Sequence, residues 1–529
     1  MANYAKTPLF GILRKAMKLA LAANKADVST EEIIQRSEEA ALLSRRKFLE
    51  NTAKTALLTR FSSLYTEESF GRVFQKSAPR IVIVGAGLAG LNALHTLKKV
   101  GIDATIYEAS GRTSGRIMSV QGAMGASTWT EFGAEFIDTT HTDMWELAKE
   151  FNLELMDSMQ PSETKLIKET YFFNGQHYTE KDIVEAFRAF APRLKRDQES
   201  LPKNIDYTNK NKRVKRFDNM SISEYLTNIG ARGWIKRFIE TAYTSEYGLS
   251  ADVQSSLNFL LYISPDTEGG HLDLYGDSDE RYKVRGGNQS IPDAIAAKYT
   301  DHIELNRSLE SIKKVGNHYE MTFSSLKNVV TADFVIIAIP FTKLRNVSIQ
   351  VPMPQVKWDV INQLGYGMNA KLMLGMKSHF WREQGFAGIV YADNGVSNGW
   401  DNAQLQTGDS ETAGLSILLG GKAGLDVGKG SVNSQKDIYL PLWEQIYKGA
   451  TEQFNGKVAR MHWASYPYSL GCYTCYTTGQ YTSISGAEAM PIGNIFFAGE
   501  HCDAEFSGFM NGAAKSGREA ANTVLAKLI

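Results

Sequence analysis

The chain has 529 residues, of which 43% are hydrophobic and 22% charged, which is typical of a globular protein with more than one domain and excludes a disordered or fibrous chain. Its 58 Lys and Arg balance 58 Asp and Glu, so we predict no nucleic-acid partner, because binding to phosphates requires a basic excess. Three cysteines in a chain of this length exclude a disulfide scaffold.

Residues 1–77 are predicted to form an N-terminal extension. Residues 1–80 hold 14 Lys or Arg and 8 Asp or Glu, which gives this part a net charge of +6. Residues 7–25 place apolar residues at helical spacing with basic residues between them, which predicts an amphipathic helix. Two interpretations stay open: the helix lies on a membrane surface, or it packs against the body of its own protein.

Residues 44–49 (SRRKFL) resemble a twin-arginine export motif. The context differs from that of a standard leader, because 43 residues precede the motif and Lys54 and Arg60 interrupt the segment that follows. Two locations therefore stay open. The protein is exported through the twin-arginine route to the periplasm or the medium, or it stays in the cytoplasm with a leader that no longer functions.

The next predicted elements have the order of a dinucleotide-binding unit. Residues 81–84 (IVIV) are typical of a strand buried in a parallel sheet, and residues 85–90 (GAGLAG) lead from it into an amphipathic helix. A second strand, residues 104–107, ends at Glu108. Strand, glycine loop, helix, strand and acid in this order predict a bound nucleotide cofactor.

Each residue type in the loop has a physical reason. Gly85 makes the tight turn, Gly87 lets the main chain approach a pyrophosphate, and Gly90 allows close packing of helix and strand. Ala89 is a further small residue at this cofactor contact, where the helix N-terminus attracts the anion. The Glu108 carboxylate can accept hydrogen bonds from ribose hydroxyls.

The residues after Glu108 identify the cofactor. Residues 108–116 (EASGRTSGR) resemble the E-A-x-x-R-x-G-G-R stretch of the flavin amine oxidase family, with Ser114 in place of the first family glycine. In that family the arginines and the main chain meet the FAD phosphates and the flavin edge. The resemblance implies FAD rather than NAD, bound in part by Ala109, Arg112, Gly115 and Arg116.

Three later segments resemble the family in the same order. Residues 131–138 (EFGAEFID) are similar to the stretch beside the isoalloxazine ring, which implies cofactor contacts from Gly133, Ala134, Glu135 and Phe136. Residues 285–291 (RGGNQSI) match the turn that opens the second FAD-binding segment. Residues 303–312 are expected to form one strand whose main chain at Leu309 holds the adenine, and residues 331–340 match the next strand.

The C-terminal segment carries the last part of the resemblance. Residues 494–500 (NIFFAGE) read as strand, glycine and acid, followed by residues 507–514 (SGFMNGAA) and a helix to residue 528. The resemblance places Glu500 by the pyrophosphate and ribityl chain, with Gly499, Phe509 and Met510 as further cofactor contacts. The start of the final helix is expected to face the flavin edge where negative charge collects.

The resemblance implies an α/β protein, α+β overall, with two domains after the extension. A Rossmann-like FAD-binding domain is expected from three segments, residues 78–140, 280–324 and 486–529. A substrate-binding domain with a mixed sheet and helices is expected from residues 141–279 and 325–485.

The substrate side contains a lone cation in an apolar run. Lys371 lies within residues 365–374 (GYGMNAKLML), which read as a strand. The resemblance implies a catalytic role in which Lys371 holds a water near flavin N5. A lysine on an exposed strand edge is the alternative.

Residues 463–476 (WASYPYSLGCYTCY) resemble the segment that walls the flavin, with Trp463 and Cys472 as cofactor contacts. The resemblance pairs Tyr473 with Phe509 as an aromatic slot that orients the amine, although the monoamine oxidases have tyrosine at both positions. Ordinary core packing of either aromatic is the alternative.

Cys472 matches a cysteine that is thioether-linked to the flavin in animal monoamine oxidases, and a free buried thiol is the alternative. No metal site is predicted, because no second pair of ligands accompanies Cys472 and Cys475.

The resemblance implies an FAD-dependent oxidase. Hydride transfer from the amine to flavin N5 would give an imine, then an aldehyde and ammonia, with molecular oxygen reoxidising the flavin to give hydrogen peroxide. Amino-acid oxidases of the family have a carboxylate-binding arginine in the block where this chain has residues 134–136 (AEF). Glu135 and Asp138 suit a second cation instead, so the preferred substrate is a primary amine or a polyamine.

An L-amino-acid oxidase that releases a 2-oxo acid, ammonia and hydrogen peroxide is the alternative. A catalytically silent flavoprotein is the alternative from a different functional class. The resemblance also leaves a homodimer open.

Overall fold

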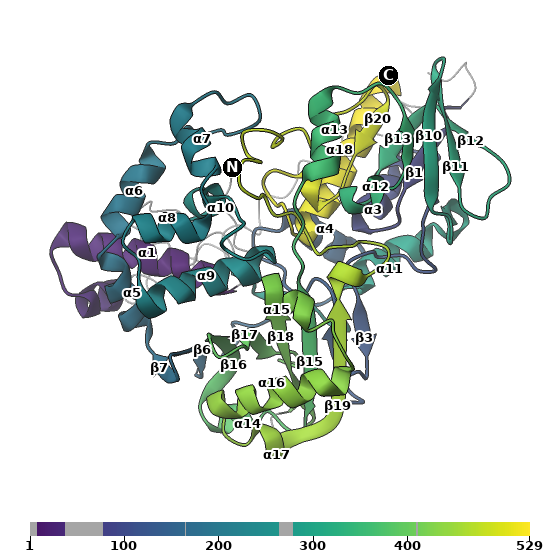
Figure 1. Cartoon of the computed structure of the whole chain (residues 1–529). Helices are drawn as coiled ribbons and strands as arrows, with labels where there is room; N and C mark the ends of the chain where they lie inside the picture. Colours follow the sequence, from purple (N-terminus) through teal and green to yellow (C-terminus); the bar gives the residue numbers. More distant parts are fainter. Residues whose placement is uncertain (1–7, 38–77, 164, 264–278, 409–410, 529) are drawn as a thin grey trace, which may run out of the picture.

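The computed structural model describes residues 8–37, 78–163, 165–263, 279–408 and 411–528. Figure 1 shows three parts: a parallel sheet with its helices at the upper right, a helical group at the left, and a mixed sheet below them. The α/β fold class and the mixed sheet expected from the sequence are confirmed.

The first part is built on a five-stranded parallel sheet, in which β1 lies at the centre. Its strands, in spatial order, are β20 (Ile495–Phe497), β13 (Phe334–Ile337), β1 (Ile81–Val84), β2 (Thr105–Tyr107) and β9 (Ile303–Glu304). All four residues of β1 are buried, as its continuous apolar run requires when a strand is covered on both faces.

The two faces of β1 contact different layers. Ile81 and Ile83 share a core with α3 (Leu88–Lys99) and α18 (Met510–Leu528), whereas Val82 and Val84 share one with a four-stranded sheet. That sheet has the order β12 (Val330–Ala332), β11 (His318–Phe323), β10 (Leu309–Val315) and β14 (Ser348–Gln350). The surrounding helices are α4 (Thr142–Glu150), α11 (Ser290–Lys298), α12 (Phe341–Leu344) and α13 (Gln355–Gln363).

The structure corrects two predicted boundaries. Residues 325–485 were assigned wholly to the substrate-binding domain, but β13 pairs in parallel with β1 and β20 inside the five-stranded sheet. Residues 303–312 were expected to form one strand. They form β9 and the start of β10, which belong to different sheets, and Asn306 between them has a φ of +59° that breaks the extended run.

The second part is a seven-stranded mixed sheet. Its order is β19 (Phe454–His462), β15 (Ala370–Met376), β18 (Ala413–Leu419), β17 (Ser397–Asp401), β16 (Phe386–Ala392), β6 (Ile167–Phe173) and β7 (Gln176–Tyr178). Only the β16–β6 pair is parallel among these described strands. Its accompanying helices are α14 (Phe380–Glu383), α15 (Gly421–Asp426), α16 (Val432–Ile446) and α17 (Ala450–Gln453).

The third part is a group of helices that includes the N-terminal helix α1 (Pro8–Ala26), drawn in purple in Figure 1. The other members are α5 (Glu180–Arg188), α6 (Ala191–Glu199), α7 (Lys212–Asp218), α8 (Ile222–Asn228), α9 (Gly233–Tyr247) and α10 (Ser256–Leu260). Leu13, Met17 and Ala20 of α1 are fully buried in their shared core. These side chains of the helix therefore pack against other helices of its own protein.

The remaining short elements are two strand pairs and three 3-10 helices. The strands are β3 (Ser119–Gln121) with β4 (Trp129–Glu131), and β5 (Leu155–Asp157) with β8 (Tyr282–Val284). The 3-10 helices are η2 (Thr300–His302), η3 (Trp463–Ser465) and η4 (Glu500–Cys502). In the part of the chain that the structure describes, no helix combines the length and apolar character needed to cross a bilayer. The twin-arginine motif at residues 44–49 lies outside the described residues.

Candidate functional site

One cavity brings together segments that are far apart in the sequence. Its wall includes the loop after β1, the end of β2, residues 133–136 and the segment that opens α18. All the residues proposed from the sequence as cofactor or catalytic contacts line this cavity except Gly90, which is buried in α3. Their individual roles stay predictions, but their convergence on one space is a feature of the fold.

The glycine loop shapes the cavity through its main chain. Gly85 has a φ of +103°, a conformation that favours glycine, and a Cβ at Gly90 would lie only 1.9 Å from the Gly85 carbonyl oxygen. Gly90 therefore packs helix against loop, as expected, without facing the cavity. At Gly87 the nearest atom to an added Cβ would be 3.9 Å away, so the space before the N-terminus of α3 is open to an anion.

Glu108 is fixed at the end of β2 beside this loop. One carboxylate oxygen accepts the Ala86 N–H at 2.8 Å, and the other accepts the N–H and hydroxyl of Ser110 at 2.8 and 2.7 Å. The oxygen that accepts the Ala86 N–H keeps a second lone pair, so the carboxylate can still accept from a ribose hydroxyl.

An ion pair joins three remote segments further along the wall. Arg116 Nη1 lies 2.8 Å from Glu500 Oε1 and also donates to the Cys472 carbonyl. The other Glu500 oxygen accepts the Gly508 N–H at 2.8 Å. Main-chain N–H groups, a fixed carboxylate and arginines around one elongated cavity fit a dinucleotide with a pyrophosphate, as FAD has.

Lys371, on β15, lies on the same wall and has three acceptors within the protein. Its Nζ lies 3.0 Å from the Glu131 carbonyl, 2.8 Å from the Gly133 carbonyl and 2.7 Å from Glu135 Oε2. An ammonium group has three N–H donors, so these contacts use all of them. This differs from the implied role, because a water held by Lys371 requires one of these contacts to open. Lys371 is 5% exposed, so it is not an exposed edge lysine.

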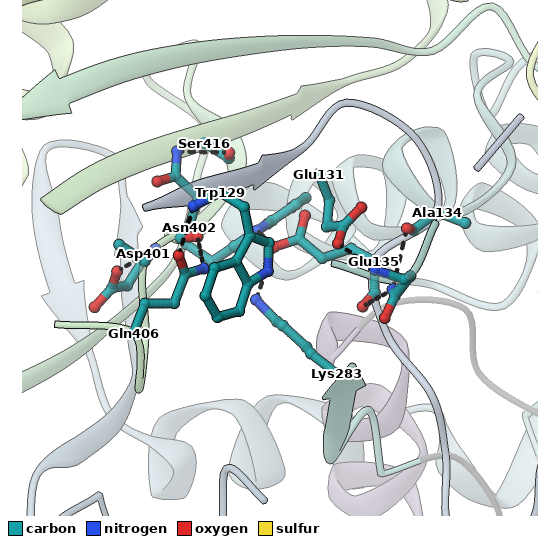
Figure 2. Close-up of polar contacts among 12 residues, drawn as sticks. Trp129, Glu131, Ala134, Glu135, Lys283, Asp401, Asn402, Gln406 and Ser416 are labelled. Carbon is teal, nitrogen blue, oxygen red and sulfur yellow. Dashed lines mark hydrogen bonds and ion pairs between the residues drawn. The ribbon is translucent and has the colours of Figure 1, made fainter. Parts of the chain in front are cut away.

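The Glu135 carboxylate accounts for this difference from the implied role, because it accepts one of the three N–H donors of Lys371. Its other oxygen lies 2.8 Å from Lys283 Nζ and accepts the Trp400 Nε1–H at 2.8 Å, so two ammonium groups share one buried carboxylate. Figure 2 shows Glu135 with its partner Lys283 and with Glu131. Burial opposes ionisation, but the two lysines outweigh it and hold the pKa of Glu135 below its usual range.

The pKa of the neighbouring Glu131 is shifted in the opposite direction. Burial raises its pKa to about 7, although Ser119 and the Asn288 N–H both donate to its carboxylate. A carboxyl group with a raised pKa and one with a lowered pKa therefore lie four residues apart on the same segment.

The proposed aromatic pair lines the same cavity. The Tyr473 hydroxyl donates to the Ser245 carbonyl at 3.4 Å, and Phe509 packs edge-on against His141 with ring centroids 5.0 Å apart. A hydrogen bond holds the Tyr473 ring and a ring contact holds the Phe509 ring, so we expect both rings to keep a fixed position in the cavity wall. Whether they act as a slot stays a prediction.

The Asp138 carboxylate already has contacts within the protein, which the sequence does not indicate. One of its oxygens accepts the Glu280 N–H at 2.7 Å, and the other lies 3.3 Å from His141 Nε2. Glu135 is held by two lysines. The two carboxylates expected to suit a second cation are therefore both engaged within the protein.

Glu280 and Asn398 are wall residues that sequence reasoning missed. Glu280 is 7% exposed and Asn398 is fully buried, and neither side chain has a hydrogen-bond partner among the described residues. Burial raises the pKa of Glu280 well above its usual range, and the Asp138 carboxylate adds to this shift. Glu280 lies in an acidic stretch that reads as a solvated loop, only five residues before the recognised turn at Arg285. Two further wall residues, Trp400 and Leu418, were also missed, as was Lys283, which contacts the wall residue Glu135, since nothing in their local sequence marks a site.

Cys472 also lines the cavity, whereas Cys475 is fully buried. No disulfide joins the cysteines in the described part of the chain, and attachment of a cofactor to Cys472 stays a prediction. Across the described ranges, no group of three or more His, Cys, Asp or Glu side chains is arranged to hold a metal ion.

Comparison with known proteins agrees with this arrangement. The family model for flavin-containing amine oxidoreductases matches residues 88–525. A flavin-containing amine oxidase of Danio rerio is 23% identical over 461 residues, covering 84% of this chain and 85% of that protein. An L-amino-acid oxidase of Crotalus adamanteus is 25% identical over 478 residues, covering 84% and 86%.

Among solved structures, cyclohexylamine oxidase from Brevibacterium oxydans IH-35A has the same fold, with a TM-score of 0.74 at 20% identity, covering 85% of this chain and 99% of that one. With the family model matched over most of its length, the chain belongs to the flavin-containing amine oxidoreductases and is an FAD-dependent amine oxidase.

Proposed function

We propose that this oxidase acts on a primary amine or a polyamine and not on an L-α-amino acid. The observation that carries the proposal is the charge of the cavity wall. Among its described residues the guanidinium groups are those of Arg112, Arg116 and Arg307, all in segments assigned to the cofactor. Phe136 occupies the block where an amino-acid oxidase of the family would offer an arginine, and a carboxylate substrate has no bidentate partner there.

The residues of the wall favour an amine in a second way. Asp138 Oδ2 lies 3.3 Å from Nε2 of His141, and Phe509 packs on the same ring, so the Asp138 carboxylate near the aromatic wall attracts a cationic ligand and repels a carboxylate. Flat aromatic walls with little access to water also favour the uncharged form of the reacting amino group, which is the form that can be oxidised.

The roles of the cofactor and of the protein's residues follow from these positions. Bound FAD supplies the redox chemistry, by accepting the electrons and hydrogen removed from the substrate carbon. Tyr473 and Phe509 hold the reacting carbon in place, and positioning of this kind is the main contribution of the chain. Glu135 and Lys371 form a fixed charged part of the wall, held by Lys283 at the other Glu135 oxygen, that needs no rearrangement when the substrate enters. Molecular oxygen is the proposed acceptor, with hydrogen peroxide as product.

A peroxide-coupled assay of the purified flavoprotein tests the proposal. We expect peroxide with alkylamines, phenethylamine or putrescine, and none with a panel of L-amino acids. Activity confined to the amino acids would overturn it in favour of an amino-acid oxidase. Flavin reduction by an amine without peroxide would leave the substrate class in place and replace oxygen by another acceptor. A flavoprotein that none of these compounds reduces would support the catalytically silent alternative.

A further inference from the structure

We propose that Glu280, together with Asn398, forms a subsite for a second ammonium group, so that the preferred substrates are α,ω-diamines. This inference rests on the proposed amine oxidation and narrows it to one class of amine. It differs from the expectation drawn from the sequence, because that expectation assigned the second cation to Glu135 and Asp138.

The first argument is the lack of partners. Both oxygens of Glu280 are buried in the cavity wall without a hydrogen-bond donor among the described residues, and the same holds for both polar atoms of the Asn398 amide. A buried carboxylate without a partner costs free energy, which folded proteins generally avoid. An ammonium group offers three N–H donors, which could serve the carboxylate and the amide oxygen together.

The second argument is the backbone at this position. Glu280 has a φ of +45°, in the left-handed region that residues with a side chain rarely adopt. Its N–H donates to Asp138 Oδ1 at 2.7 Å, and this bond holds the residue in the strained conformation. Strain that is held by a neighbour, at a residue whose unpartnered carboxyl group lines a cavity, is typical of a binding site.

The third argument is the location. Glu280 lines the same cavity as Tyr473, the wall proposed to orient the reacting amine, and it is among the groups that, after burial, raise the pKa of the Tyr473 hydroxyl. It also affects Tyr391 on β16, which pairs with Asn398 of β17. The carboxyl of Glu280 and the amide of Asn398 thus line the same cavity as the aromatic pair proposed to hold the reacting carbon.

The charges around Glu280 agree with a cationic ligand. Its neighbours Asp138, Glu135 and Glu246 are acids, and Lys168 is the opposing cation among the groups that affect it. Binding of a second ammonium would favour ionised Glu280, and the attraction between the two buried charges would give the discrimination.

Matched substrate pairs test the subsite directly. Putrescine and butylamine have the same carbon chain, as do cadaverine and pentylamine, so each pair differs only in the second amino group. In the unaltered enzyme we expect kcat/KM for the diamine to exceed that of the monoamine by about 100-fold. N-acetylputrescine, in which the second amine is masked, should behave like butylamine.

The variant Glu280→Gln removes the charge and keeps the shape. We expect it to lower kcat/KM for the diamines by about 100-fold and to leave the monoamines within about threefold of the unaltered enzyme. Anaerobic stopped-flow measurement of flavin reduction separates binding from chemistry, and the effect should fall on the apparent Kd. Glu452→Gln, at an exposed glutamate, is the matched control and should change neither substrate class.

The outcomes are separable. Equal losses on diamines and monoamines in Glu280→Gln would show a structural role and overturn the subsite, as would no loss on either. Should Glu280→Gln fail to fold, the comparison of putrescine, N-acetylputrescine and butylamine on the unaltered enzyme still decides, and equal rates would refute it. Oxidation of monoamines as well as diamines would leave the proposed function standing, whereas activity on amino acids alone would remove both.

Discussion

The cofactor side of the cavity is formed largely by main chain, whereas the substrate side is formed by side chains from remote segments. On the cofactor side, Gly85, Gly87 and Gly90 set the path of one loop, and Glu108 is fixed by N–H groups of its own neighbourhood. On the substrate side, Lys371, Glu135 and Lys283 come from three places in the chain and meet in a buried charged group. A site made by a local main-chain path is specified locally, while a site made by packed side chains depends on the whole fold.

The largest expected effect comes from removing support behind the substrate side. Deletion of residues 1–37 removes α1, whose buried side chains share a core with α5 and α9, and α9 ends beside the Ser245 carbonyl that anchors Tyr473. Loss of several buried side chains of about 2 kcal/mol or more each exceeds the stability of a typical domain. We expect insoluble protein, measured by expression and size-exclusion chromatography.

The same deletion bears on the export motif. Cleavage after residues 44–49 would also remove α1, so we expect the mature protein to retain residues 8–37, as intact mass would show. A soluble, FAD-containing protein without these residues would contradict both expectations.

On the cofactor side, two glycines should separate folding from binding. Gly90→Ala places a Cβ 1.9 Å from the Gly85 carbonyl oxygen, so the loop has to move, and we expect loss of FAD together with a lower melting temperature. Gly87→Ala meets nothing closer than 3.9 Å, so it should fold normally and yet lose FAD affinity by about tenfold or more, because the methyl group points to the pyrophosphate space. Flavin absorbance after gel filtration measures both, and equal behaviour of the two variants would contradict the assigned difference.

The charged group on the substrate side should respond as a unit. Glu135→Gln leaves Lys371 and Lys283 buried beside each other without a carboxylate, and we expect a loss of about 3–5 kcal/mol in the free energy of unfolding. Adding Lys283→Met removes the surplus charge and should restore a large part of that loss. Denaturant unfolding of the single and double variants measures the coupling. Additive losses would show that the two residues do not act together.

Glu131 gives the smallest effect, and it depends on pH. Its pKa of about 7 in the folded protein lies above the usual value of 4.5, so its contribution to stability is fully present below pH 4.5 and is lost as the pH rises through 7. Over that window the loss amounts to at most about 3 kcal/mol. Glu131→Gln mimics the protonated acid, so the variant should gain stability relative to the unaltered protein at pH 8 and show little difference at pH 4.5. Melting temperatures at both pH values measure this, and a constant difference would contradict the raised pKa.

The sequence by itself determined the cofactor side. The order of strand, glycine loop, helix and acid, together with the arginines after Glu108, was sufficient to predict FAD and the family, because these features depend on neighbours in the chain. It did not assign residues 334–337 to the parallel sheet, since an apolar strand does not carry the identity of its partner.

Only the tertiary structure decided the charges of the substrate side. Lys371 was recognised, but its three acceptors were not, because Glu131, Gly133 and Glu135 lie more than 230 residues away. Glu280 reads as one acid in a polar stretch, and only the packing of Asp138 and the cavity wall around it shows that it is buried and unpaired. The electrostatics of a side chain are set by burial and by its neighbours in space, and those are properties of the fold.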